Sequence, residues 1–116
     1  MRQTLGKEDR IHRARELDRV FREGRSAANA YLRLLAVPNE LGRARMAVAV
    51  SRRHGQAVAR NRVKRLCREA FRTTRERLPT GYDYVLLPAA GKELTVPALQ
   101  ESLVSLSRAV TGGSAP

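Results

Sequence analysis

A short segment between Arg60 and Arg68 concentrates five cationic side chains in nine residues. Four of the five are arginine, whose planar guanidinium forms paired hydrogen bonds with phosphate and stacks on bases. The wider segment 52–77 holds ten Lys and Arg against two Glu, which is +8 of the chain's net charge of +12. Because so concentrated a charge repels itself in the folded state, it predicts a fixed polyanionic partner, either nucleic acid or an anionic membrane surface.

A helical projection of this segment separates an apolar face from a cationic face. The apolar face should pack against the rest of the protein, and it comprises Val63, Leu66, Cys67, Ala70, Phe71 and Thr74. The cationic face comprises Asn61, Lys64, Arg65, Arg68, Arg72 and Arg75, with Arg60 and Arg62 at its edges. Like charges four residues apart cost a helix roughly 0.2–0.5 kcal/mol per pair, so a face selected only for solubility would interleave acids. Asn61 either contacts a base edge or a sugar, or it is an ordinary surface residue.

Side chains that could catalyse a reaction are few and scattered. Cys67 lies on the apolar face with no His or Asp beside it in sequence, which is typical of a structural thiol. One cysteine and two histidines, His12 and His54, do not make a zinc site. His54 either donates to a phosphate or is a plain loop histidine. The acids are not grouped as a protein nuclease would need to hold Mg²⁺, so we expect no catalytic residue and no protein-bound metal.

Six elements should position these residues. Helices are predicted over residues 14–23, 57–77 and 94–110, and strands over 30–37, 45–50 and 82–87. This order predicts an α+β fold, a small two-layer sandwich in which a hairpin of the first two strands shares one sheet with the third. Residues 14–110 should form one domain between a basic N-terminal arm (1–13) and a flexible tail (111–116). In the second strand, the small Ala47 and Ala49 predict either a floor open to a ligand or a face crowded by a neighbouring element.

Composition also narrows the class of protein. No apolar run approaches the roughly 20 residues that span a bilayer, and the charged N-terminus lacks the apolar core of a signal peptide, so a cytoplasmic location without a membrane partner is expected. Three alternatives remain beside an RNA-binding subunit. They are a self-sufficient nuclease, a general RNA-binding or ribosomal protein, and a basic DNA-binding protein. The last is disfavoured because no segment of the sequence has the pattern of a helix-turn-helix recognition helix.

Several segments together resemble one family. Residues 57–71 closely resemble the signature helix of the bacterial ribonuclease P protein component. Residues 50–55 resemble the strand end and basic pair that precede that helix. Residues 17–24, the pair Asp83 and Tyr84, and the closing helix also fit, so the resemblance covers about residues 10–109.

The resemblance implies a function in which the protein assists a catalytic RNA. It implies an α+β sandwich with a left-handed βαβ crossover, whereas the general rule would give the opposite hand. A large RNA subunit with bound Mg²⁺ would hydrolyse precursor tRNA to release the 5′ leader, and the protein would bind both RNAs without an obligate protein partner. The residues implied to face the catalytic RNA are Arg60, Asn61, Arg62, Lys64, Arg65, Arg68 and Arg72.

The 5′ leader would lie between this helix and the sheet, near Phe21, Ser51, Arg52 and Arg53. The family often has aromatic residues where Leu17 and Leu35 stand, and a basic residue after the third strand, where residues 88–90 have none. Stacking contributes roughly 1–3 kcal/mol per base, so these departures would weaken leader stacking or replace it with apolar packing.

Overall fold

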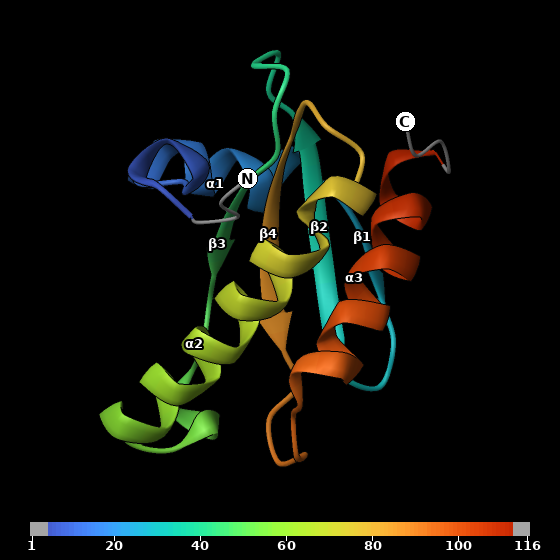
Figure 1. The fold of residues 1–116 in the computed structure, drawn as a ribbon. Coiled ribbons are helices and arrows are strands. Elements are labelled where there is room, and N and C mark those ends of the chain that lie inside the picture. Colours follow the sequence, from blue (N-terminus) through green and yellow to red (C-terminus); the bar gives the residue numbers. More distant parts are fainter. Residues whose placement is uncertain (1–4, 113–116) are drawn as a thin grey trace.

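The three predicted strands form three of the four strands of a mixed sheet in the computed structural model, which describes residues 5–112 (Figure 1). The strands are β1 (Arg25–Ala28), β2 (Leu32–Pro38), β3 (Arg45–Val48) and β4 (Tyr82–Pro88). Their order in the sheet is β1-β2-β4-β3. β2 pairs antiparallel with both β1 and β4, and β3 pairs parallel with β4.

One sequence-based expectation about the sheet was wrong, and one strand was missed. The predicted hairpin between residues 30–37 and 45–50 does not form, because β4 lies between β2 and β3 and pairs with both. The hairpin partner of β2 is instead β1, which the sequence did not predict. β1 has the small, polar sequence Arg-Ser-Ala-Ala without apolar alternation, so only its pairing with β2 makes it a strand.

Three helices cover the sheet: α1 (Ala14–Glu23), α2 (Ala57–Thr74) and α3 (Val96–Thr111). α2 ends earlier than predicted, since residues Arg75–Arg77 continue as a 3-10 turn. α3 begins two residues later than predicted, because the Thr95 hydroxyl caps it by accepting the Ala98 N–H at 3.3 Å. The last residues of the predicted tail, 113–116, lie outside the described residues.

The two faces of the sheet carry separate apolar clusters. α2 and α3 cover one face and form the predicted two-layer sandwich, with Phe71 and Tyr84 fully buried in the larger cluster. α1 lies on the opposite face, where Val20 packs over Leu35 and Val85. Because β-strand side chains alternate, β2, β3 and β4 each supply residues to both clusters, and the sheet is held between helices on its two faces.

The connection β3–α2–β4 joins two neighbouring parallel strands through a helix. In Figure 1, β3 and β4 both run downward, with β4 to the right of β3 and α2 in front of the sheet. That arrangement is a left-handed crossover, as the resemblance implied and against the general preference for right-handed ones. It places the N-terminal end of α2 beside the end of β3.

The described part of the N-terminal arm, residues 5–13, lies against β3. Arg10 forms a parallel bridge with Met46, the Ile11 N–H donates to the Met46 carbonyl at 3.0 Å, and Ile11 is buried. Asp9 adds a 3.0 Å ion pair with Arg75 beyond the end of α2. These contacts join the arm to two elements that are distant in sequence. No helix within residues 5–112 is long and apolar enough to cross a bilayer.

The Asp9 contact should make stability depend on pH. Burial opposes ionisation of Asp9, but hydrogen bonds from the Gly6 N–H and from Arg75, with the charges of Arg75 and Arg43, outweigh it and hold the pKa below its usual value. Its stabilisation is therefore present above the unfolded-state pKa of about 3.9 and is lost as the pH falls through the lower folded-state pKa. Asp9→Asn should unfold at lower urea concentration than the parent at pH 7, and the gap should close in acid. An unchanged midpoint at pH 7 would contradict this.

Candidate nucleic-acid interface

α2 presents its two predicted faces as the sequence indicated. Cys67, Ala70, Phe71 and Thr74 are buried, and Val63 and Leu66 are half-buried beside them. On the other side, the exposed residues are Asn61, Arg62, Arg65 and Arg68, while Arg60 and Lys64 are half-buried. The apolar face anchors the helix on the sheet, so the cationic face is held rigidly toward solvent.

The cations of α2 fall into two groups by their contacts. Arg72 forms a bidentate pair with Glu69, with Nη2 to Oε2 at 2.6 Å and Nε to Oε1 at 3.1 Å. This hydrogen bonding lowers the pKa of Glu69 and raises that of Arg72. Within residues 5–112, no ion pair involves the other cations of the helix, Arg60, Arg62, Lys64, Arg65 and Arg68. The surface with uncompensated charge is therefore the N-terminal two thirds of α2.

A cleft of about 440 Å³ runs between α1, the end of β3 and α2. Its lining combines apolar and polar side chains from three elements: Leu17, Val48, Ala49, Val50, Ala57, Arg60, Asn61 and Lys64. Arg60 contributes a buried Nε–H that has no hydrogen-bond partner among the described residues. A buried donor without an acceptor is unfavourable in the free protein, so this atom is suited to an acceptor brought by a ligand.

Ala47 of β3 and Ala49, just after the strand, fit the two interpretations that the sequence left open. Ala49 packs against the cluster under α1 but also lines the cleft, so at that position the small side chain forms part of an open floor. Ala47 packs in the apolar cluster under α1, where a neighbouring element crowds it.

The turn after β3 holds the basic pair Arg52 and Arg53 in a fixed conformation. The Ser51 hydroxyl accepts the Arg53 N–H at 3.2 Å, and the Ser51 N–H donates to His54 Nδ1 at 3.2 Å. The other ring nitrogen of His54, Nε2, lies 2.8 Å from the Pro88 carbonyl and donates to it. Both ring nitrogens are thus used within the protein, so His54 attaches this turn to the end of β4.

The predicted leader residues do not all share one surface. Leu17 lines the cleft, and Phe21 is 45% exposed on α1. Ser51 and Arg53 line a neighbouring hollow of about 480 Å³ at the end of the sheet, which shares Ala49 and Val50 with the cleft.

The structure corrects the assignment of Leu35 to the leader surface. Only 7% of Leu35 is exposed, because α1 packs over it in the second cluster. Val48, Val50 and Ala57 were not predicted, although they flank the basic turn in sequence.

Cys67 should be unreactive in the folded protein. Burial raises the pKa of its thiol to about 12, against a smaller opposing effect of the nearby Arg68 charge. Because only the thiolate is nucleophilic, we expect Ellman's reagent at pH 8 to modify native Cys67 at least about a hundredfold more slowly than the urea-unfolded chain. Equal rates in the two states would show that the apolar face of α2 is not buried.

A small α+β domain with a rigid cationic helix beside a half-apolar cleft belongs to the class of proteins that bind a polyanionic chain. A comparison with known families shows which family within this class the chain belongs to. The Ribonuclease P family model matches residues 5–110, and this chain belongs to that family. Ribonuclease P is an endoribonuclease of tRNA processing, and the chain falls among its protein components.

Individual relatives agree in sequence and in structure. The ribonuclease P protein component of Pelotomaculum thermopropionicum is 37% identical over 84% of this chain and 88% of its own length. That of Caldanaerobacter subterraneus subsp. tengcongensis is 38% identical over 91% of this chain and 90% of its own. The solved RNase P protein of Thermotoga maritima superposes with a TM-score of 0.79 at 30% identity, covering 89% of this chain and 98% of that one.

Proposed function

We propose that this chain is the protein subunit of ribonuclease P, which binds the catalytic RNA subunit and the 5′ leader of precursor tRNA and so promotes removal of the leader. The observation that carries the proposal is the uncompensated charge of α2 next to the cleft. Five cations without ion pairs among the described residues lie along one rigid helix. RNA supplies phosphates at a spacing that such a row can neutralise together, with release of counterions.

The two RNAs would contact different parts of this surface. The catalytic RNA would lie on the outer ridge of α2, where Arg65 and Arg68 are exposed. The single-stranded leader would enter the cleft, where Asn61 and Lys64 can contact its backbone and Arg60 Nε can donate to an oxygen. Leu17 offers this leader an apolar contact and no aromatic ring, so leader binding here would depend less on stacking.

Hydrolysis would take place on the RNA subunit with Mg²⁺ held by RNA. Within residues 5–112, no three His, Cys, Asp or Glu residues come together as a metal site would require. We therefore assign the Mg²⁺ to the RNA and a different task to the protein side chains. Their contribution is to hold phosphates of two RNAs near each other and to lower the repulsion between them.

Reconstitution tests the proposal directly. The protein alone should leave precursor tRNA intact. Added to a bacterial ribonuclease P RNA at a Mg²⁺ concentration too low for the RNA to act by itself, it should restore release of the leader. Cleavage by the protein alone, or no effect on the RNA, would refute the proposal. The Glu101→Gln variant is a suitable control, because it changes a charge that is exposed on α3, outside the cleft, and should leave the restored activity unchanged.

A further inference from the structure

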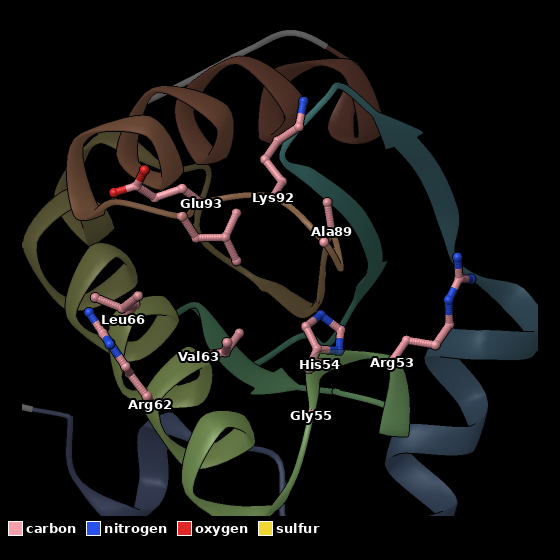
Figure 2. A pocket seen from close by; sticks show the side chains of 11 residues that line it. Arg53, His54, Gly55, Arg62, Val63, Leu66, Ala89, Lys92 and Glu93 are labelled. Carbon is pink, nitrogen blue, oxygen red and sulfur yellow. The ribbon is translucent and has the colours of Figure 1, made fainter.

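A second hollow lies on the flank of α2 that faces away from the cleft. It encloses about 560 Å³ between α2, the turn at His54 and the loop from β4 to α3 (Figure 2). At about 100° per residue, its α2 residues Arg62, Val63 and Leu66 lie on the side of the helix opposite to Arg60, Asn61 and Lys64. A ligand in this hollow would therefore lie outside the cleft, although Arg53 borders both this hollow and the one at the end of the sheet.

The hollow has an apolar floor. Val63 and Leu66 of α2 face Ala89 and Leu94 of the loop, and all four are half-buried. The His54 ring stands at its edge in Figure 2, and since both its nitrogens bond within the protein, it offers a ligand mainly its flat face. The volume is within the roughly 300–1,000 Å³ usual for sites that take small organic groups.

The rim of the hollow is cationic. Arg62 borders it from α2 and Lys92 borders it from the loop, with Glu93 as the acidic residue of the lining. In Figure 2 the Lys92 ammonium points away from Arg62, so this flexible side chain has to turn inward to meet a ligand in the hollow. Among residues 5–112, neither Arg62 nor Glu93 forms an ion pair, and Lys92 lies 4.9 Å from the centre of the uncharged Tyr31 ring. The positive charge of the rim is thus not neutralised by a partner within the described part of the chain.

An apolar floor and a cationic rim suit different parts of one ligand. A free inorganic anion would not need the floor, and a purely apolar ligand would not need the rim. A nucleotide satisfies both, because its base can stack on an apolar or aromatic surface while its phosphate is held by Arg and Lys. The rim residues are exposed, so the chain on either side of such a nucleotide can continue into solvent.

We propose that this hollow binds one unpaired nucleotide of an RNA chain, with the base against Val63, Leu66, Leu94 and the His54 ring and the phosphate against Arg62, toward which the Lys92 side chain turns on binding. The identity of the RNA that supplies this nucleotide rests on the proposed function. The expectation that the hollow binds a nucleotide does not rest on it. α2 would then contact RNA on both flanks, with the leader on one and a separate unpaired nucleotide on the other.

Titration of the full-length, ¹⁵N-labelled protein with adenosine 5′-monophosphate tests the site by NMR. The amide resonances of Leu66, Lys92 and Leu94 should shift, and inorganic phosphate should shift them much less. The single-stranded trinucleotide ApApA should shift the same resonances at lower concentration than the mononucleotide. Equal effects of phosphate and mononucleotide, shifts confined to the cleft, or a mononucleotide response without a trinucleotide response would each overturn the proposal.

Paired variants separate binding from folding. Lys92→Glu should weaken mononucleotide binding about tenfold, which is the loss expected for one charge-assisted hydrogen bond. Glu93→Gln should strengthen it, an effect that misfolding could not produce. The matched controls are Arg108→Glu, in the last turn of α3, and Glu101→Gln, both exposed and outside the hollow. If Lys92→Glu and Arg108→Glu weakened mononucleotide binding equally, the loss would reflect only the net charge of the protein, and the proposed site would be wrong.

The two proposals fail separately. Mononucleotide binding at Lys92 together with failed reconstitution would reject only the proposed function. Successful reconstitution without any response of Leu66, Lys92 and Leu94 would reject only the nucleotide site.

Discussion

Replacing Phe71 with alanine should lower the free energy of unfolding by roughly 3–5 kcal/mol, the range measured for large aromatic residues in protein cores. Phe71 is fully buried on α2, and its ring centre lies 6.3 Å from that of Tyr84 on β4. Truncation would leave a cavity between the helix and the sheet, at the contact that anchors the cationic helix to β4. Urea unfolding followed by circular dichroism measures the change.

The matched variant on the opposite face of α2 is Arg68→Ala. Arg68 is exposed and is not part of an ion pair within residues 5–112, so its loss should leave the unfolding midpoint almost unchanged. The same variant should weaken binding to ribonuclease P RNA, because it removes a phosphate contact and its counterion release. If Arg68→Ala destabilised the fold as much as Phe71→Ala does, the division of α2 into an anchoring face and a binding face would be wrong.

Replacing Asp83 with alanine should be comparably destabilising, by roughly 3–5 kcal/mol, because it leaves a partly buried arginine without its partner. Asp83 is 3% exposed on β4 and accepts three hydrogen bonds. Arg45 donates from Nε at 2.8 Å and from Nη2 at 2.7 Å, and Asn39 Nδ2 donates at 2.8 Å. The hydrogen bonds to the Asp83 carboxylate raise the pKa of Arg45 in the parent protein. The variant loses these bonds, but an arginine guanidinium stays protonated in proteins even without them, so the charge remains.

Two further variants test the cause of this loss. Glu16→Ala removes only the longer 3.4 Å contact of α1 with Arg45 and should cost much less than Asp83→Ala. Arg45→Met combined with Asp83→Leu removes both charges and should recover part of the stability, since no buried charge is left alone. Thermal unfolding of the four proteins measures the series. A double variant less stable than Asp83→Ala would show that the pair itself, and not the orphaned charge, accounts for the effect.

The local parts of this fold could be predicted from the sequence, and the non-local parts could not. The faces of α2 follow from the period of Val63, Cys67 and Phe71, because an 18-residue helix repeats its pattern several times. β1 shows no such pattern, since Arg25–Ala28 becomes a strand only by pairing with β2. The loop at Asn39 has the composition of a hairpin turn, yet β3 pairs with β4, which follows it by more than thirty residues.

The same difference between local and non-local features applies to the residues of the candidate site. The cations of α2 and the turn at Ser51 are adjacent in sequence, so their nearness was predictable. Leu35 was misassigned because its burial depends on α1, which approaches it across the sheet. Lys92 and Leu94 carry no signal in the sequence, and only the packing of the β4–α3 loop brings them to α2.

The bridge between Arg10 and Met46 has a consequence for how the protein behaves in a crowded cell. β3 is an edge strand, and an open edge is a template on which another chain can add a strand and begin aggregation. The Ile11 N–H bonds to the Met46 carbonyl, so the N-terminal segment occupies part of that edge with the protein's own backbone. The other edge, β1, is only four residues long and begins with a charged arginine, both of which discourage such pairing. The N-terminal segment therefore leaves less of this edge open to strand addition by another chain.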